Sequence, residues 1–306
     1  MSLSENIEMI KRTLHFGNPC SLRKRDLQLV IEYPEERIDP VTVPIEDIGL
    51  MVLDNPQIII TNALIMSLNE NNIAVLSCDT SHLPFGLMLP MYSHHAFTEK
   101  LGDQIEASLP LKKNLWQQTV IAKISNQAAL LKAKGMSTDK IDYFIRQVKS
   151  DDSTNVEGRA AAHYWDCVFG DLSFIRHRFG EPPNNMLNYG YAILRAIIAR
   201  SLIGSGLFPT IGIHHRNKYN PYCLADDVME PYRPFVDSLI LDLLEKIEPP
   251  EELSPAIKKE LLKIPVLDVV IDGSRSPLMI ATQRTTASLA GCFGGTLRKI
   301  VYPVLQ

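Results

Sequence analysis

The sequence predicts an α+β protein in which a small N-terminal β-rich domain precedes a larger, mainly α-helical domain. Short runs rich in valine, isoleucine and leucine, bounded by proline, asparagine, aspartate or glycine, fill roughly the first ninety residues. From about Ala96 onward, apolar residues recur instead at helical spacing. The 306 residues suffice for two domains of about 150 residues each. We therefore expect one domain over residues 1–92 and another over residues 93–306.

Four apolar runs in the N-terminal part predict strands, over residues 27–33, 41–55, 57–61 and 73–79. Residues 62–72 carry apolar side chains at helical spacing and end in an asparagine-rich stop, which predicts one helix. Pro84, Gly86 and Pro90 then follow one another closely, which predicts the end of the strands and a hinge.

The C-terminal part is dominated by amphipathic patterns in which apolar residues recur at i, i+3, i+4 and i+7. These predict helices within residues 113–135, 140–150, 188–204, 234–247, 254–264 and 277–301. One short apolar run over residues 266–273 predicts a strand among them.

Charge and composition narrow the class of protein. The net charge of −4 gives no support to a protein that coats nucleic acid nonspecifically, although a local basic face would be enough for binding. The N-terminus lacks the apolar core of a signal peptide, and no uncharged apolar run reaches the roughly 20 residues that span a bilayer. The five cysteines form no CxxC pair, which indicates reduced thiols. We expect a cytoplasmic protein that does not enter a membrane.

Glu157 lies in the stretch STNVEGRAAAHYWDCVFG, at the head of a run of small residues. One interpretation is structural, because Thr154 and Glu157 have the spacing of a helix capping box. The other is functional, since Gly158 and the alanines at 160–162 would allow another element to approach closely, and Gly158 also weakens the helix by about 1 kcal/mol. The local sequence leaves both open.

Three further acids, Asp226, Asp227 and Glu230, fall within five positions. In a helix such like charges would repel by a few tenths of a kcal/mol unless a cation lies between them. Pro231 indicates a kinked first turn that would still direct two carboxylates one way. The alternative is a solvated acidic helix start favoured by the helix dipole.

His214 and His215 precede this acid cluster, and adjacent residues diverge so much that at most one can face a shared site. One histidine with several carboxylates makes a set of mostly oxygen ligands that suits Mg²⁺ or Mn²⁺ better than Zn²⁺. Such metals commonly serve phosphate chemistry. A lone histidine is more often an ordinary core or surface residue.

Basic residues cluster around the same motifs and indicate a surface for a phosphate backbone. They are Arg176, His177, Arg178, Arg195, Arg200, Arg216, Lys218 and Arg233. Taken singly, each is more typical of a solvated charge or a structural ion pair.

Taken together, these blocks resemble the CRISPR-associated integrase-endonuclease of spacer acquisition, the Cas-one family. The resemblance covers nearly the whole chain. In the C-terminal part, NVEGRAAAHYW, NNMLNYGYAILRA and GIHHRNKYNPYCLADDVMEPYRPFVD resemble the three signature blocks of the family. The N-terminal part, through VPIEDIGLMVLDN and LPFGLMLP, resembles its β-domain. The compact length is most similar to the type II CRISPR branch.

The resemblance also implies a role for individual residues. The metal-binding glutamate of the family falls on Glu157, and its histidine, in a G-x-x-H pattern, falls on His215 rather than His214. Its final acid pair falls on Asp227 and Glu230, where many members carry aspartate at the second position. Glu157, His215 and Glu230 would be catalytic and hold Mg²⁺ or Mn²⁺, with Asp227 either ligating or supporting. The expected DNA contacts are Arg176, Arg178, Arg195, Arg200 and Arg216.

The reaction implied is metal-dependent attack of the 3′-hydroxyl of a captured DNA fragment on a phosphodiester of the CRISPR repeat. The implied assembly is a homodimer, formed through the N-terminal domain, that joins the second adaptation protein, of the Cas-two family, in a heterohexamer. The type II effector nuclease and a DNA-clamping protein are further implied partners. Two alternatives remain: a free-standing metal-dependent nuclease or phosphodiesterase, and a non-catalytic DNA-binding scaffold.

Overall fold

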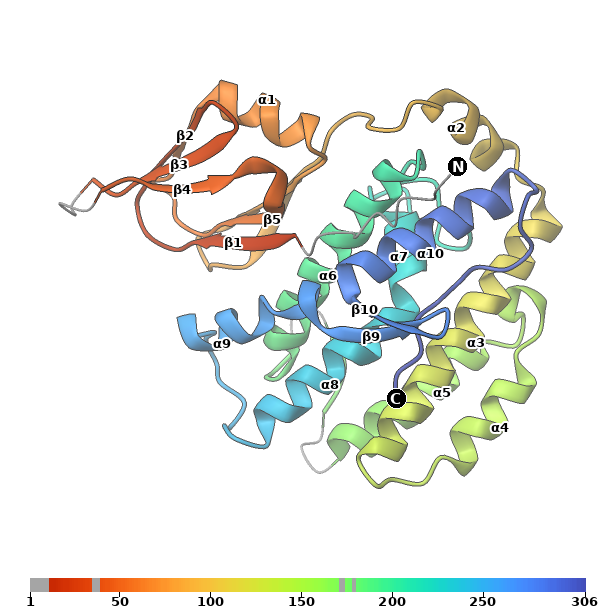
Figure 1. Ribbon diagram of the computed structural model, residues 1–306. Helices are drawn as coiled ribbons and strands as arrows, with labels where there is room; N and C mark the ends of the chain where they lie inside the picture. Colours follow the sequence, from red (N-terminus) through yellow and green to blue (C-terminus); the bar gives the residue numbers. More distant parts are fainter. Residues whose placement is uncertain (1–10, 35–38, 171–173, 178–179) are drawn as a thin grey trace. The chain divides into compact units, whose positions relative to one another are not determined.

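The computed structural model describes residues 11–34, 39–170, 174–177 and 180–306 (Figure 1). The chain separates into two compact units, Met1–Ser93 and His94–Gln306. Within the described residues, no helix is long and apolar enough to span a membrane.

The described part of the first unit contains two four-stranded sheets. One has the order β1-β5-β7-β8, in which β1, β5 and β7 run parallel and β8 is antiparallel to β7. The other has the order β4-β3-β2-β6. The strands are β1 (Arg12–Phe16), β2 (Ser21–Arg25), β3 (Gln28–Glu32), β4 (Val41–Pro44), β5 (Ile48–Leu53), β6 (Ile59–Ile60), β7 (Ala74–Cys78) and β8 (Pro84–Met88).

One hydrophobic core serves both sheets and helix α1 (Asn62–Glu70). Leu22 and Leu29 from one sheet, Ile48 and Met51 from the other, and Leu64 from the helix are buried in it. Each element alone could not cover its apolar face, so the sheets and the helix stabilise one another by shared burial.

Two sequence predictions for this unit are wrong. Residues 41–55 form two strands of different sheets, because a 3₁₀ turn at Ile45–Asp47 separates β4 from β5. The segment with Pro84 and Gly86, interpreted as the end of the strands, is itself strand β8. A sheet edge tolerates proline, and Gly86 fits opposite Ser77, where an added Cβ would lie 2.3 Å from the Ser77 hydroxyl oxygen.

The second unit is mainly helical, as predicted. Its helices are α2 (Phe97–Glu106), α3 (Leu109–Ala133), α4 (Asp139–Gln147), α5 (Val156–Phe169), α6 (Asn184–Gly204), α7 (Cys223–Met229), α8 (Arg233–Leu244), α9 (Pro255–Leu261) and α10 (Leu278–Phe293). The predicted strand over residues 266–273 is β9 (Asp268–Ile271), and it pairs with β10 (Ser274–Pro277). Asp272 and Gly273 both have positive φ, which suits a two-residue hairpin turn.

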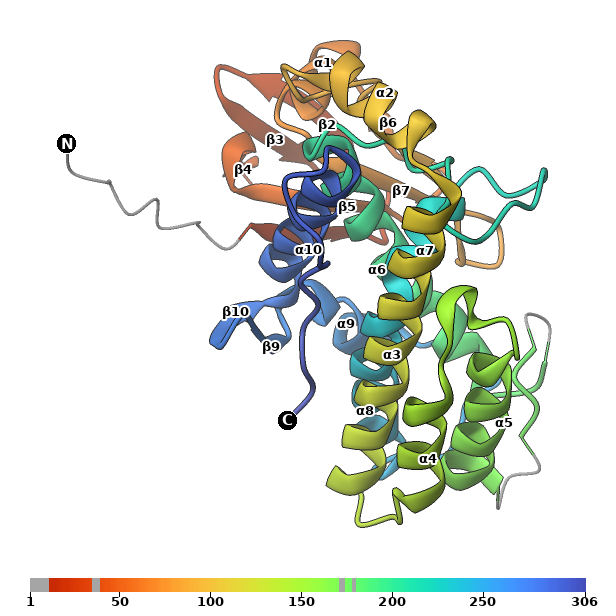
Figure 2. The same cartoon turned by 90° about the vertical axis from the view of Figure 1, so that its right-hand side faces the viewer.

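Helix α3 organises the part of this unit that carries the predicted site. It lies beside α4, α5 and α8 (Figures 1 and 2), and its N-cap residue is Ser108, whose hydroxyl accepts from the Leu111 amide. Its buried Asn126 donates to the carbonyl oxygens of Pro231 and Pro303, at 2.7 and 3.0 Å. This side chain therefore fixes the turn after Glu230 against α3.

Candidate metal centre

Glu157 lies in the first turn of α5, but its carboxylate does not cap the helix. The N-cap residue is Asn155, whose side chain accepts from the Gly158 amide. Asp152 accepts from the amides of Val156 and Glu157, at 2.8 and 2.9 Å. The capping-box interpretation of Thr154 and Glu157 is therefore wrong.

Gly158 belongs to this cap. A Cβ there would lie 2.8 Å from Oδ1 of Asn155. The glycine thus makes room for the capping side chain rather than for another helix, contrary to the sequence interpretation. Since Asp152 and Asn155 satisfy the helix start, the Glu157 carboxylate is left for another contact.

That contact is the Lys123 ammonium of α3, which also meets Glu230. Lys123 forms an ion pair with Glu157, and its Nζ lies 2.5 Å from Oε2 of Glu230. The Lys123 side chain is 10% exposed, Glu230 7% and Glu157 27%. Two predicted metal ligands that lie 73 positions apart in the sequence, from Glu157 to Glu230, thus converge on one cationic group.

Glu230 begins the 3₁₀ turn Glu230–Tyr232 between α7 and α8, a kink that Pro231 explains because it disfavours continued α-helix. Its Oε1 lies 2.9 Å from Nη2 of Arg233. Burial by itself raises the pKa of Glu230, but Arg233 and Lys123 outweigh it and lower the pKa to about 2. Glu230 is therefore a carboxylate at neutral pH.

Asp227 is fully buried, and both of its carboxylate oxygens accept hydrogen bonds from the loop that precedes it. Oδ2 accepts from the amides of Ile213 and His214, at 2.6 and 3.0 Å. Oδ1 accepts from the amide of His215, at 3.2 Å, and from its ring Nδ1, at 2.5 Å. Of the two roles implied for Asp227, this geometry favours support over direct ligation.

The rings of His214 and His215 meet edge-on, with centroids 5.6 Å apart, and contact different partners. Trp116 of α3 stacks on His214, with ring centroids 4.3 Å apart, and meets His215 edge-on at 5.7 Å. Because Asp227 binds Nδ1 of His215, Nε2 is the ring nitrogen left to ligate a metal. The hydrogen bond to Asp227 raises the pKa of His215, against the effect of burial, and the charges of Asp227 and Glu230 add to it. The Glu230 carboxylate is thus among the groups that stabilise the charged form of the His215 ring.

These residues fit a divalent metal by their chemistry. Oε2 of Glu230 is buried and, apart from its ion pair with Lys123, accepts no hydrogen bond of regular geometry from any described residue. The Lys123 ammonium marks a position that Glu157 and Glu230 both reach. Two carboxylates and one imidazole form a donor set suited to Mg²⁺ or Mn²⁺. In the part of the chain that the structure describes, however, no three acid, histidine or cysteine side chains are already arranged around a metal position.

Comparison with known proteins places the chain in a family. Residues 15–252 match the family described as CRISPR associated protein Cas1. The chain is 35% identical over 274 residues to the CRISPR-associated endonuclease Cas1 of Neisseria meningitidis serogroup C (strain 8013), which covers 89% of this chain and 88% of that relative. The chain belongs to the Cas1 family.

Solved structures share the fold that was predicted for it. A casposase bound to integration product superposes with a TM-score of 0.78 at 21% identity, covering 95% of this chain and 92% of the casposase. A structure of a Cas6-RT-Cas1–Cas2 complex gives a TM-score of 0.72 at 17% identity, covering 98% of this chain and 37% of that one. The α+β fold class of a Cas1 protein, with its β-rich N-terminal part and helical C-terminal part, is confirmed.

The arginines expected to contact DNA differ widely in their surroundings. Arg200 is 3% exposed and burial lowers its pKa to about 10, so its expected contact with the DNA backbone is wrong. Arg176 donates to the side-chain oxygens of Asn184 and Asn188 and lies over the Tyr191 ring, so it has a structural role in this Cas1 chain.

Of the three remaining arginines, the structure describes Arg195 and Arg216. Arg195 donates to Asp226 at 2.6 Å and is 39% exposed. Arg216 is exposed. Arg178 lies outside the described residues.

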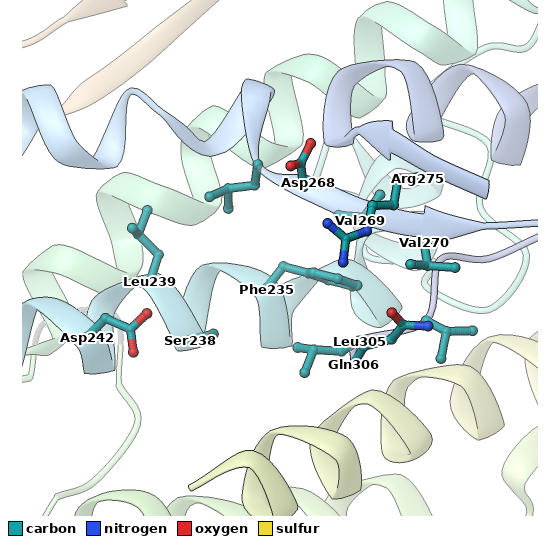
Figure 3. Close-up of a pocket in the computed structure, with 12 residues that line it drawn as sticks. Phe235, Ser238, Leu239, Asp242, Asp268, Val269, Val270, Arg275, Leu305 and Gln306 are labelled. Atoms are coloured by element: carbon teal, nitrogen blue, oxygen red, sulfur yellow. The ribbon is translucent and has the colours of Figure 1, made fainter. Parts of the chain in front are cut away.

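A cavity of about 480 Å³ lies beside the histidine of this Cas1 site. Its lining includes His215, Lys112, Arg216, Lys218 and Asn217. A second cavity, of about 310 Å³, lies between α8, the β9–β10 hairpin and the last residues of the chain (Figure 3). None of the predicted site residues lines this second cavity. The first cavity therefore combines a predicted site histidine with three basic side chains.

Three residues of α3 that shape this Cas1 site were missed in the sequence: Trp116, Lys123 and Asn126. A signal was present, because Lys123 follows Trp116 by seven positions on a helix face that also carries the apolar Val120 and Ile124. A lysine on a buried helix face needs a charged partner. The sequence does not say which acid supplies it.

We expect Gly212→Ala to distort the loop that carries His215. A Cβ at this position would lie 2.4 Å from the His215 carbonyl oxygen and 2.8 Å from Oδ2 of Asp227. The backbone cannot yield cheaply, so the free energy of unfolding should fall by about 1–3 kcal/mol in urea titrations. Gly102→Ala is the control, because no atom lies within 4 Å of its Cβ position and alanine should stabilise helix α2 by about 0.5–1 kcal/mol. Equal effects of the two changes would contradict this account of the loop.

Proposed function

We propose that this chain is a divalent-metal-dependent DNA integrase and endonuclease of CRISPR spacer acquisition. It would join the 3′-hydroxyl of a captured DNA fragment to a phosphodiester in the CRISPR repeat. The observation that carries the proposal is the convergence of Glu157 and Glu230 on one cation position, where the charge of Glu230 also raises the pKa of His215. A relative named as an endonuclease and a structural neighbour bound to integration product support it.

Glu157, Glu230 and His215 are the residues that would hold Mg²⁺ or Mn²⁺. When bound, the metal would polarise the phosphoryl oxygen and activate the attacking hydroxyl. Asp227 keeps the His215 ring in the tautomer that leaves Nε2 free. Arg233 holds Glu230 in its ionised form. The proposed reaction needs no protein nucleophile, since the attacking hydroxyl belongs to the DNA.

The DNA backbone would run over the cavity beside His215. Arg216 and Lys218 are exposed and line it together with Lys112. Arg216 and Lys218 lie on the loop that also carries the proposed metal-binding histidine, so a phosphate held by them would be close to the metal. Arg195 is a further candidate because its side chain is partly exposed.

The proposed assembly follows the family resemblance and the neighbouring structures. A Cas6-RT-Cas1–Cas2 complex and a Cas1–DNA complex are among the structural neighbours, which supports Cas2 and DNA as partners. We further propose a homodimer through the N-terminal unit that joins Cas2 in a heterohexamer. The type II effector nuclease and a DNA-clamping protein remain proposed partners of that assembly.

Replacing Arg216 and Lys218 together by alanine tests the DNA path. Two lost phosphate contacts should lower DNA affinity for every sequence and reduce the slope of log affinity against log salt by about 2. The rate of strand transfer of a labelled fragment into repeat DNA should fall together with the DNA affinity, while hydrolysis of a small phosphodiester should persist. Fluorescence anisotropy over a salt series and a strand-transfer assay with magnesium provide the two measurements.

The matched control removes one arginine and one lysine that do not line the cavity, Arg284 and Lys246, both of which are exposed. If both double variants change the salt slope equally, the DNA path over this cavity is wrong. If the wild type with Cas2 cleaves DNA but never joins it in any divalent metal, the chain is a free-standing nuclease.

A further inference from the structure

Lys123 occupies the centre of the acid cluster, although it is neither a predicted metal ligand nor a predicted DNA contact. It extends from the middle of α3 and is buried. Its ammonium contacts Glu157 of α5 and Glu230 of the 3₁₀ turn. A buried ammonium with no anionic partner would be strongly destabilising.

The two glutamates are the anionic partners that this buried lysine needs, since each places a carboxylate oxygen against its ammonium. The converse also holds: without a cation between them, Glu157 and Glu230 would be two carboxylates in close proximity with little solvent to screen them. The cluster therefore needs a positive charge at this position even when no metal is bound.

The second cation of the cluster cannot take that role. Arg233 contacts Oε1 of Glu230, and its guanidinium carbon lies 4.7 Å from the centroid of the Tyr191 ring. It is fixed by these two contacts, and no ion pair joins it to Glu157 among the described residues. Lys123 instead carries its charge on a flexible four-carbon chain, so its ammonium can leave without moving α3.

We propose that Lys123 is a positioning residue that holds Glu157 and Glu230 together as a built-in counter-cation and is displaced when the divalent metal binds. The metal affinity of the site is then set by competition with this ammonium. The inference rests on the proposed function, since it assumes a metal at these carboxylates. It adds that the metal-free site is kept folded by the lysine and that metal entry breaks two ion pairs.

The test is the affinity for Mn²⁺, measured by isothermal titration calorimetry on the full chain. Lys123→Met removes the competing charge and keeps much of the apolar side chain, so the dissociation constant should fall by about tenfold or more. The melting temperature of this variant should be lowered without metal and restored by Mn²⁺. Lys123→Arg keeps a positive charge and should bind Mn²⁺ no more tightly than the wild type.

Lys134→Met is the matched control. Lys134 is the C-cap residue of the same helix and also pairs with two carboxylates, Asp242 and Glu245, at 2.7 and 2.6 Å. These acids are largely exposed, and the control should leave Mn²⁺ affinity unchanged. An equal effect of Lys123→Met and Lys134→Met would overturn the inference.

A measurement on the wild type covers the case in which Lys123→Met does not fold. An amine-reactive reagent should modify Lys123 slowly without metal and faster with Mn²⁺, as followed by peptide mass spectrometry, and no change in that rate would overturn the inference.

The outcomes separate this inference from the proposed function. Equal Mn²⁺ affinity of wild type and Lys123→Met would overturn the inference and leave the metal site intact. Tighter binding by Lys123→Met in a protein that never joins DNA would support the inference and contradict the integrase. Absence of Mn²⁺ binding in both proteins would overturn the two together.

Discussion

Glu157→Gln is expected to slow DNA strand transfer by about a thousandfold or more, because a neutral amide replaces one of the two carboxylates that would hold the metal. The fold should survive, since Asp152 and Asn155, not Glu157, satisfy the start of α5. The measurement is the rate at which labelled prespacer DNA joins repeat DNA in magnesium with Cas2 present. Thermal melting of the same preparation shows that the variant is folded.

Glu99→Gln is the control for this change. Glu99 also lies in the first turn of a helix, α2, and is exposed. The control should join DNA at the wild-type rate. Should Glu157→Gln join DNA as fast as the control, Glu157 does not hold the catalytic metal.

Asp227→Asn should cause the largest loss of stability of any change at the site. The carboxylate accepts three backbone amides and the His215 ring, and it is fully buried. An asparagine presents an NH₂ donor at one of the two oxygen positions, so at least one backbone amide loses its acceptor, and the amides of Ile213 and His214 both lose it if the NH₂ group replaces Oδ2. The free energy of unfolding should fall by about 3–5 kcal/mol in urea titrations.

The neighbouring acid provides the comparison for Asp227. Asp226 is also buried, but it accepts from the side chains of Arg195 and Asn220 rather than from backbone amides, so Asp226→Asn should cost less, about 1–2 kcal/mol. Asp227→Asn should also weaken Mn²⁺ binding, because the His215 ring loses its orientation. If Asp227→Asn is as stable as Asp226→Asn, the loop is not held by this carboxylate.

Local patterns were enough to predict most of the fold. Residues 28–32 and 74–78 are strands because their valine, isoleucine and leucine side chains are buried on a sheet, as their composition indicates. The long helix α6 follows its apolar repeat, with an extra turn at its start. By contrast, β1 and β2 (RTLHF and SLRKR) carry too many polar residues to be recognised, and pairing with neighbouring strands decides their structure.

The candidate site was predictable only where its residues lie in a short motif. His215, Asp227 and Glu230 fall within one stretch, and Glu157 was identified through the family resemblance. Lys123 is 34 positions from Glu157, and no local pattern indicates that they meet. The error on Arg200 has a simple cause. Five residues of helix turn the side chain by about 140°, so Arg200 points into the core while Arg195 reaches the surface.

The most direct test of the central claim is the anomalous scattering of a bound Mn²⁺ ion in crystals of the chain grown with that metal. The account predicts an anomalous peak bounded by Glu157, Glu230 and Nε2 of His215, with the Lys123 ammonium moved away from both carboxylates. A peak on other residues, or a site in which Lys123 still pairs with both glutamates and no manganese is bound, would contradict it.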